Sequence, residues 1–333
     1  MRAVRLTGIH QLEIAEVASP VPAAGEAIVE LRAAALNHRD VWIKAGQYAG
    51  LKFPCIPGSD GAGVVTAVAG DGDRDWVGRE VIINPSFGWG ENDRAQGGGF
   101  SILGLPRDGT LAEQIAVPIS QLAPKPAAFS WEEAAALPLA GLTAWRAIST
   151  RAALHARERV LITGVGGGVA LFALQFAVAH AAEVWVTSSS DEKIARAVAL
   201  GAKGGANYTA PGWAAEFSQR VGGGFDVIVD SAGGEGFESL MDLAAPGGRV
   251  VFFGATRGNP PVLPMRKVFW RQLSLLGTTM GSPSDWWAMT QYLAQHPIKP
   301  VISEVVPMGR AADAFALMER GGQFGKIVVR TRE

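Results

Sequence analysis

The chain has 333 residues, a formal net charge of −1 and 48% hydrophobic residues. This length and apolar content suffice for two folded domains, and the near-neutral charge argues against nucleic acid or an anionic membrane as the main partner. No apolar run approaches the ~20 residues that span a bilayer, and the first residues lack the apolar core of a signal peptide. We therefore expect a cytoplasmic protein. The single cysteine, Cys55, excludes an internal disulfide and a cysteine-rich zinc site.

Short strand-like segments separated by Gly and Pro occupy about the first 122 residues. They cover residues 3–6, 26–35, 63–68, 80–84 and 111–117. The regular spacing of turns predicts a small antiparallel, barrel-like domain. From Ser130 the sequence becomes rich in alanine, and Ser130 with Glu133 has the spacing of a capping box that begins a helix. This change of composition marks the entry to a second domain.

The second region, residues 123–265, alternates apolar strand-like runs with helical segments. The runs cover residues 159–163, 183–187, 225–230 and 249–254. This alternation predicts a parallel, doubly wound sheet that binds its ligand at the carboxyl ends of the strands. Beyond it, residues 273–277 and 326–330 are strand-like and residues 310–320 are helical. We expect this tail to return to the first domain, giving one domain of residues 1–122 and 266–333 and another of residues 123–265.

A glycine-rich turn follows the first run, with four glycines within residues 164–168. The usual dinucleotide spacing G-x-G-x-x-G is incomplete because Val169 stands at its last position. The spacing Gly164-x-x-Gly167-x-x-Ala170 fits better, since it keeps a small residue wherever helix, strand and ligand crowd together, and Gly168 lies in the same turn. Such a turn lets the N–H groups of the following helix hold a pyrophosphate. The alternative is a glycine-rich turn that binds nothing.

Five motifs occur in the order found in medium-chain dehydrogenase/reductases: residues 37–40, 57–63, 137–144, 164–170 and 325–328. The chain resembles this superfamily, and most closely its zinc-independent quinone oxidoreductase branch, which is related to zeta-crystallin. The resemblance implies an α/β fold in which a Rossmann doubly wound parallel sheet is inserted in a GroES-like β-barrel catalytic domain. Relatives dimerise by joining the outer strands of their cofactor sheets. We therefore expect a homodimer formed through the apolar edge at residues 272–277.

The resemblance also predicts that the protein holds no metal. Zinc members carry a cysteine, a His-Glu pair and a further cysteine or acid where this chain has Asn37, Ser59 with Asp60, and residues 137–140. A catalytic zinc takes about three protein ligands from Cys, His and carboxylate, and only Asp60 qualifies. Asp40 matches a residue that supports the metal's ligands in zinc enzymes.

Without a Lewis acid, simple alcohol oxidation is disfavoured, and acceptors that take hydride readily, such as quinones or activated enones, are favoured. By resemblance Asn37 and Tyr48 line the site, where an amide N–H and a phenol O–H could stabilise developing charge or deliver a proton. The alternatives are a turn-forming Asn37 and a Tyr48 that only packs. Other possible functions are a metal-free alcohol or carbonyl dehydrogenase and a non-catalytic dinucleotide-binding protein.

The residues after the second strand of the α/β region predict NADPH as the cofactor. NAD enzymes place an acid at this point to hold the ribose, whereas NADP enzymes supply hydroxyls and cations. Here no acid stands in the first places, and Ser189, Lys193 and Tyr208 match the residues that hold the 2′-phosphate in quinone oxidoreductases. The alternative is an NAD enzyme in which Asp191 reaches the ribose.

Three further cofactor contacts come from the resemblance alone. Thr143 is placed near the cofactor, Gly254 beside the nicotinamide, and Lys326 over the pyrophosphate as a cation. For Lys326 the alternative is an ordinary charge at a strand edge.

Overall fold

A computed structural model describes residues 1–332 and divides the chain into two compact units. Unit 1 comprises Met1–Leu142 and Ser282–Glu333, and unit 2 comprises Thr143–Gly281. The chain thus leaves unit 1, builds unit 2 and returns. The boundaries lie later than the expected positions 122 and 265. At the first boundary, helix α2 (Trp131–Ala136) packs on strands β3 and β4 of unit 1; at the second, strand β15 (Ser274–Gly277) joins the sheet of unit 2.

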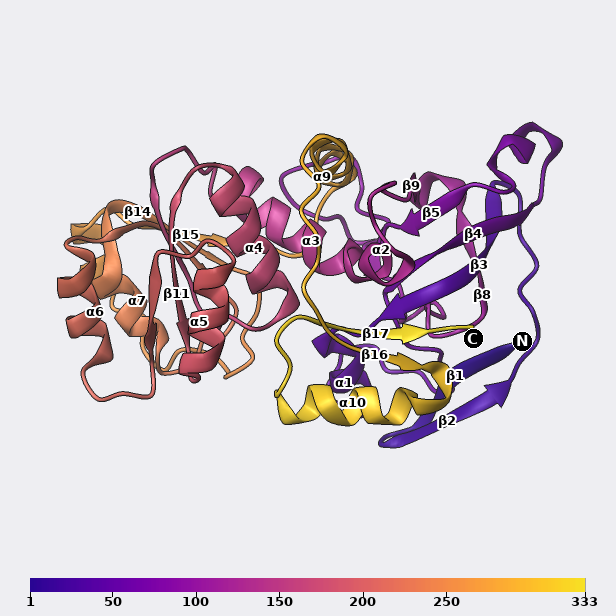
Figure 1. Cartoon of the computed structure of the whole chain (residues 1–333), viewed down its shortest axis with the longest axis horizontal. Helices are drawn as coiled ribbons and strands as arrows, with labels where there is room; N and C mark the ends of the chain where they lie inside the picture. Colours follow the sequence, from indigo (N-terminus) through magenta and orange to yellow (C-terminus); the bar gives the residue numbers. More distant parts are fainter. Residues whose placement is uncertain (333) are drawn as a thin grey trace. The chain divides into compact units, whose positions relative to one another are not determined.

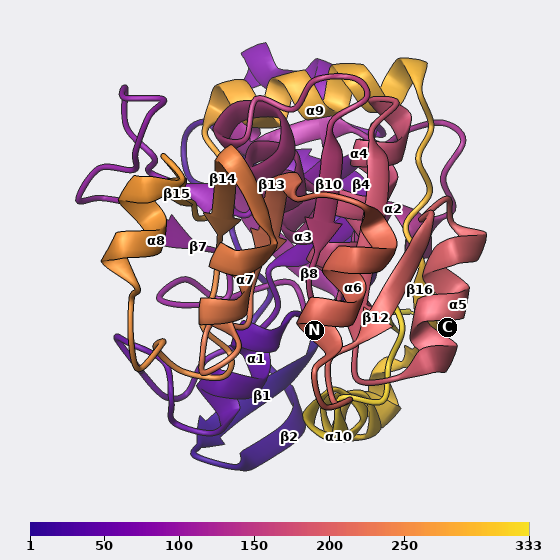
Figure 2. The same cartoon turned by 90° about the vertical axis from the view of Figure 1, so that its left-hand side faces the viewer.

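Unit 2 is built on a parallel sheet of six strands in the order β12-β11-β10-β13-β14-β15 (Figures 1 and 2). The first strand along the chain lies in the middle, and the chain winds outward from it in both directions, which is the doubly wound Rossmann order. The fold class predicted for this region is confirmed. The remaining strands are β10 (Arg159–Ile162), β11 (Glu183–Ser188), β12 (Gly204–Asn207), β13 (Phe225–Asp230) and β14 (Ala244–Phe252).

Helices cover both faces of this sheet. In Figure 1, α4 (Gly168–Ala179) and α5 (Asp191–Ala199) lie on one face, and α6 (Trp213–Val221) and α7 (Phe237–Leu243) on the other. Phe217 of α6 packs on Trp185 and Phe225, with ring centroids 5.7 and 5.6 Å apart. Burial of these large rings fixes α6 against the sheet. The other helical segments are α3 (Pro138–Trp145), the π-helical η3 (Arg146–Arg151) and α8 (Met265–Trp270).

Unit 1 contains a largely antiparallel sheet in the order β16-β17-β3-β4-β5-β9, with β8 also paired to β3 (Figure 1). Its core is formed by inward side chains such as Val29, Leu31, Val65 and Val81. Two short hairpins complete the unit. The strands are β1 (Arg2–Gly8), β2 (Gln11–Glu16), β3 (Glu26–Ala35), β4 (Asp60–Val68), β5 (Glu80–Ile83), β6 (Ser86–Phe87), β7 (Ser101–Ile102), β8 (Gln114–Pro118), β9 (Leu122–Pro124), β16 (Ile302–Pro307) and β17 (Lys326–Arg330).

The C-terminal segment completes unit 1. Strand β17 lies between β3 and β16, and Phe315 of α10 packs on Ile327 and Val329. The predicted capping box of α2 is present, since Ser130 and Glu133 exchange hydrogen bonds. No helix within residues 1–332 is long and apolar enough to cross a membrane. The further helical segments of the unit are α1 (His38–Lys44), η1 (Asp71–Trp76), η2 (Ile119–Gln121), α9 (Pro283–Gln295), η4 (Met308–Arg310) and α10 (Ala311–Arg320).

Candidate active site

The glycine turn of unit 2 joins β10 to α4. Gly164 has φ +60° and Gly166 has φ +138°, a backbone region that side chains with a Cβ rarely adopt. The Gly164 N–H donates to the Thr187 hydroxyl and the Val165 N–H to the Thr187 carbonyl, so the turn is tied to the end of β11. The sequence is therefore rich in glycine here because the backbone conformation requires it.

The same turn leaves room above the first residues of α4. Gly167 is the N-cap of this helix, and a Cβ added there would meet no described atom within 4 Å. Gly168 and Val169 follow in the first turn, and Ala170 is buried against the sheet. A 12-residue helix with a small, uncrowded N-terminus fits the phosphate cradle expected from the sequence.

The carboxyl ends of β13 and β14 lie on the same side of the sheet as this turn, because all six strands are parallel. Asp230, at the end of β13, accepts hydrogen bonds from the Thr163 hydroxyl at 2.5 Å and the Gly233 N–H at 2.9 Å. Burial raises the pKa of Asp230 despite these bonds. A Cβ on Gly254 would lie 3.1 Å from the Ser231 carbonyl oxygen, so the loops after β13 and β14 approach closely.

Lys193 lies over the glycine turn. A Cβ on Gly166 would be 3.1 Å from Lys193 Cδ and 3.5 Å from its Nζ. The Lys193 N–H donates to Ser190, the N-cap of α5, and Ser189 is exposed just before it. Burial, and then the nearby charge of Arg196, lower the pKa of Lys193. The structure thus places Lys193 beside the glycine turn, and Ser189 lies exposed just after β11.

Tyr208 follows β12, and its N–H donates to the carbonyl of Ser188 at the end of β11. The guanidinium of Arg257 lies over its ring, 5.8 Å from the centroid. Sequence reasoning missed Arg257 because it stands in an irregular loop after β14. Asp191, the residue that would favour NAD, accepts a hydrogen bond from the Asn207 amide at 3.2 Å.

Thr143 belongs to another part of unit 2. It is buried, and its hydroxyl lies 3.9 Å from the Met280 sulfur. Its predicted cofactor contact stays a prediction.

In unit 1, three chemically active side chains meet in the interior. Lys326 Nζ lies 2.8 Å from Asp60 Oδ2 and 2.7 Å from Asn37 Oδ1, and Asn37 Nδ2 donates to Asp60 Oδ2 at 2.9 Å. The other oxygen of Asp60 accepts the Leu139 N–H at 2.7 Å. All three side chains are buried. The sequence prediction brought Asn37 and Lys326 into the site but gave Asp60 no role beyond that of a possible ligand.

The ammonium of Lys326 is fully engaged inside unit 1. Its three N–H groups match three acceptors, the Leu36 carbonyl at 2.8 Å, Asn37 and Asp60. A cation so held would have to exchange one of these bonds to reach a pyrophosphate. The structure shows the contacts of Lys326 with Asn37 and Asp60. Its contact with the cofactor stays a prediction.

The donor set at this point does not fit a catalytic zinc. Among the positions of zinc ligands named above, Asn37 and Ser59 are neutral, and both oxygens of Asp60 already accept hydrogen bonds. Within residues 1–332, no group of three or more His, Cys, Asp or Glu side chains could hold a metal ion.

Asp40 holds the backbone around this cluster. Its two oxygens accept the N–H groups of Asn37 at 2.8 Å and Gly58 at 3.0 Å. Burial raises the pKa of Asp40, against the lowering effect of Arg39 and these bonds. Because both oxygens face the backbone, the structure gives Asp40 a positioning role, whereas the sequence placed it among catalytic residues.

Tyr48 does not contact Asn37 but a residue that the sequence did not single out, Arg39. The Arg39 Nε–H donates to the Tyr48 hydroxyl at 3.3 Å, and the guanidinium lies 4.9 Å from the ring centroid. Arg39 is buried and also donates to Ser59 and to the carbonyls of Leu103 and Leu105. The pattern N-H-R-D offered no signal for it, because an arginine in a first helical turn is usually solvated.

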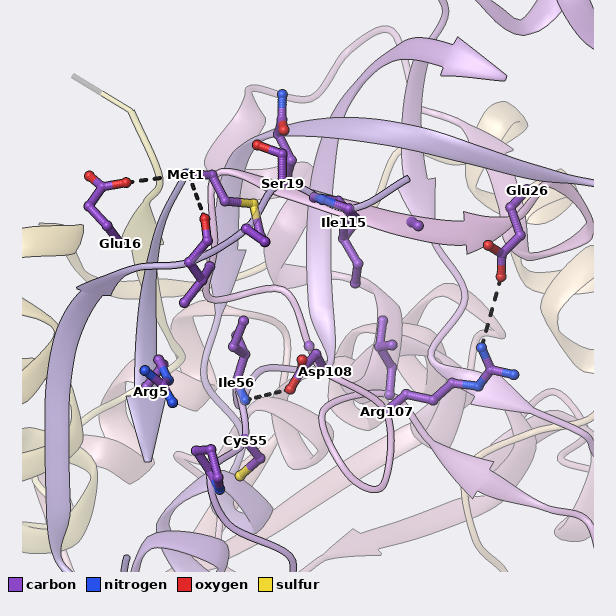
Figure 3. Close-up of a pocket in the computed structure, with 18 of the residues that line it drawn as sticks. Met1, Arg5, Glu16, Ser19, Glu26, Cys55, Ile56, Arg107, Asp108 and Ile115 are labelled. Atoms are coloured by element: carbon purple, nitrogen blue, oxygen red, sulfur yellow. Dashed lines mark hydrogen bonds and ion pairs between the residues drawn. The ribbon is translucent and has the colours of Figure 1, made fainter. Parts of the chain in front are cut away.

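Two other features of unit 1 lie outside these contacts. Trp42 pairs with the exposed His38, with ring centroids 6.2 Å apart. A separate pocket of about 750 Å³ is lined by side chains including Cys55, Arg107 and Asp108 (Figure 3). None of the candidate residues lines it, so we assign it no part in the site.

Comparison with known proteins matches both units. The alcohol dehydrogenase GroES-like domain matches residues 23–127, and the zinc-binding dehydrogenase domain matches residues 168–295. The chain is 35% identical to the zinc-type alcohol dehydrogenase-like protein YogA of Leptosphaeria maculans, covering 96% of this chain and 94% of that protein. It is 27% identical to the quinone oxidoreductase of Pongo abelii, over 99% and 97% of the two chains. A solved NAD-dependent alcohol dehydrogenase superposes with a TM-score of 0.92 at 39% identity, over 99% of each chain.

The doubly wound sheet, the glycine turn and these matches define an oxidoreductase of the nicotinamide-dinucleotide class. The chain belongs to the medium-chain dehydrogenase/reductase superfamily, and the family and fold predicted from the sequence are confirmed.

Proposed function

We propose that this protein is an NADPH-dependent reductase of quinones or activated enones that works without zinc. The observation that carries the proposal is the cluster of Asn37, Asp60 and Lys326, in which two positions matched to zinc ligands hold a neutral amide and a carboxylate that is paired with a lysine ammonium. Without a Lewis acid an alcohol is hard to oxidise, whereas a conjugated acceptor takes hydride more readily. The similarity to a quinone oxidoreductase supports this choice.

Four groups in unit 2 support NADPH. Ser189 and Tyr208 follow the adjacent strands β11 and β12, Lys193 lies in the first turn of α5, and Arg257 adds a second cation over Tyr208. A 2′-phosphate favours such cations and hydroxyls. The structure with 39% identity is described as NAD-dependent, which is the competing assignment. Here the Asn207 amide donates to Oδ1 of Asp191 at 3.2 Å, so a ribose hydroxyl would share this carboxylate with Asn207.

A metal-free alcohol or carbonyl dehydrogenase is the second candidate, favoured by the resemblance to alcohol dehydrogenase-like proteins. A non-catalytic dinucleotide-binding protein is the third. The Tyr48 hydroxyl favours an enzyme, because a partly buried phenol that receives a hydrogen bond from arginine is a suitable proton donor.

We further propose a homodimer. Strand β15 is an edge strand whose described neighbour is β14, and α8 lies beside it (Figure 2). Met265, Phe269 and Trp270 of α8 are 59, 64 and 82% exposed. An open sheet edge beside exposed aromatic side chains favours pairing with a second copy. We also place the protein in the cytoplasm, with a quinone or enone rather than a nucleic acid as partner.

A screen of cofactor oxidation tests the proposal. Purified protein is given NADPH or NADH with quinones, enones, simple aldehydes and alcohols, and the zinc content of the same sample is measured. We expect turnover with NADPH and a quinone or enone at well below one zinc per chain. Turnover confined to alcohols, or one tightly bound zinc per chain, would contradict the proposal.

A further inference from the structure

We propose that Arg39 is a positioning residue that keeps Tyr48 aimed as the proton donor of the reaction and stabilises the phenolate left after proton transfer. The inference rests on the proposed reductase function and adds to it a residue that the sequence analysis did not single out.

Arg39 is an unusual buried charge. Its side chain is 5% exposed, yet no carboxylate in residues 1–332 forms an ion pair with it. Its recorded hydrogen-bond partners are neutral: the Tyr48 and Ser59 hydroxyls and the carbonyls of Leu103 and Leu105. The carboxylate of the adjacent Asp40 interacts with it electrostatically but forms no ion pair with it. Burying an arginine without a direct ion pair costs free energy. A negative charge that develops nearby during the reaction would therefore be strongly stabilised.

The hydrogen bond between Arg39 and Tyr48 has only one possible direction. A guanidinium has donors and no acceptor, so the Tyr48 oxygen must accept from Arg39 Nε, at 3.3 Å. The phenol proton cannot point along this bond. Within the described residues, the Tyr48 hydroxyl donates to no protein acceptor, so its proton remains available to a ligand or to water.

The surrounding residues hold both groups in place. The Tyr48 ring packs on a cluster that includes Leu6, Ile43 and Leu105. The Arg39 guanidinium lies 4.9 Å from the centroid of that ring and is anchored by its bonds to Ser59 at 2.8 Å and Leu103 at 2.7 Å. A donor fixed in this way needs little reorganisation when charge appears on the phenol oxygen.

The chemical step balances without any further reactant. A reduced nicotinamide, when bound, supplies hydride to the conjugated acceptor. The acceptor also needs one proton at its oxygen: the O–H bond of Tyr48 breaks, a new O–H bond forms on the acceptor, and the electron pair stays on the phenol oxygen. That phenolate lies beside the Arg39 guanidinium until water returns the proton.

The test is a double-mutant cycle between Arg39→Lys and Tyr48→Phe, because lysine keeps the charge but cannot both stack on the ring and donate in the same geometry. We expect Arg39→Lys alone to lower kcat about 10–100-fold with KM changed less than about threefold, within the range of general acid catalysis. Its solvent isotope effect on kcat should rise. In the Tyr48→Phe background the same change should alter kcat less than about twofold, since little coupling remains.

A second measurement does not depend on activity. The chain has three tyrosines, so carbon-13 label at tyrosine Cζ gives three NMR signals, and the one lost in Tyr48→Phe belongs to Tyr48. We expect Arg39→Lys and Arg39→Met to shift this signal and leave Tyr208 and Tyr292 in place. Arg79→Lys, which changes an exposed arginine 5.1 Å from the ring centroid of the half-buried Trp76, is the matched control and should change neither kcat nor the Tyr48 signal.

The outcomes separate the two proposals. Equal losses from Arg39→Lys with and without Tyr48, or a Tyr48 signal that does not move, would overturn the role of Arg39. Wild-type protein that turns over no quinone or enone would instead overturn the proposed function. The carbon-13 NMR measurement would still show whether Arg39 changes the environment of the Tyr48 hydroxyl.

Discussion

The Nζ atom of Lys326 lies 2.8 Å from Oδ2 of Asp60, and the two side chains are only 4 and 0% exposed. The pair joins β4 to β17, which are more than 260 residues apart along the chain. Breaking a buried pair leaves one charge unpaired, which costs far more than the pair itself contributes.

Replacing either partner alone should therefore strongly destabilise unit 1. We expect Lys326→Met or Asp60→Asn to lower the free energy of unfolding by about 3–5 kcal/mol, and the double variant to recover part of this loss. Urea unfolding measures the change. Lys299→Ala removes the exposed pair with Glu133 and should cost less than about 1 kcal/mol. If both changes lowered the free energy of unfolding equally, the buried pair would contribute no more to stability than the exposed pair.

Lys193 and Arg257 should decide the cofactor preference. We expect Lys193→Ala or Arg257→Ala to weaken NADPH binding about 10–100-fold, the range for a bond to a charged group, and to leave NADH nearly unchanged. Isothermal titration calorimetry gives both dissociation constants. Lys203→Ala, which removes an exposed partner of Glu183, is the control. Wild-type protein that binds NADH more tightly than NADPH would reverse the assignment.

The pH dependence of this binding follows from the Lys193 pKa, which burial lowers. Only the protonated ammonium attracts the 2′-phosphate. Above about pH 6, near which the 2′-phosphate loses its second proton, NADPH affinity should thus fall as pH rises through the lowered Lys193 pKa, and Lys193→Ala should abolish this component of the pH dependence.

Alanine substitutions at two neighbouring glycines of the turn should have different effects, one on stability and the other on binding. Gly166 has φ +138°, so Gly166→Ala should destabilise the protein by about 1–3 kcal/mol through backbone strain. Gly167 has an ordinary φ of −78° and open space around it. Gly167→Ala should keep stability within about 1 kcal/mol, yet weaken dinucleotide binding, because its methyl group occupies the approach of the pyrophosphate. Thermal unfolding with and without cofactor separates the two effects, and an unchanged affinity for Gly167→Ala would argue against the cradle.

The proposed dimer depends on the aromatic side chains of α8. We expect Trp270→Lys to shift the protein from dimer to monomer, since interface aromatics carry much of the binding energy. Light scattering after size exclusion reports the mass. Trp287→Lys, at a 66% exposed position on α9, should leave the mass unchanged. A wild-type monomer would remove the proposal.

Cys55 should be almost inert while the protein is folded. Burial, followed by the charges of Asp108 and Asp40, raises its pKa from 9.0 to about 11. At pH 8 the thiolate fraction is then about 100-fold lower than for a thiol with the reference value. Alkylation by iodoacetamide, followed by mass spectrometry, should be at least that much slower before denaturation than after it. Rapid labelling of native protein would show that the cluster around Cys55 opens.

The sequence predicted the elements whose pattern is local. Strands β3 and β13 have the predicted bounds, and the capping box at Ser130 is present. It missed α9, although Ser282 and Asp285 form the same kind of box, and it missed β12, whose four residues include two glycines. A strand of that composition is held by its neighbour β11 rather than by its own propensity.

The same distinction between local pattern and tertiary contact holds for the site. The glycine turn was visible because it requires consecutive residues of one type. The contact among Asp60, Lys326 and Asn37 forms only when β17 has paired with β3. No spacing in the sequence therefore predicts it. Arg39 was hidden for a further reason: a charge at the start of a helix is ordinarily exposed, and its burial is visible only in the packed structure.

Insertion of β17 between β3 and β16 has a consequence for biosynthesis. As the nascent chain leaves the ribosome, unit 2 is complete once residue 281 has emerged, whereas the Ala33–Ala35 end of β3 lacks its partner β17 until residues 326–330 follow. Unit 2 is thus ready to fold first, and the incomplete sheet of unit 1 must avoid aggregation until its last strand is translated.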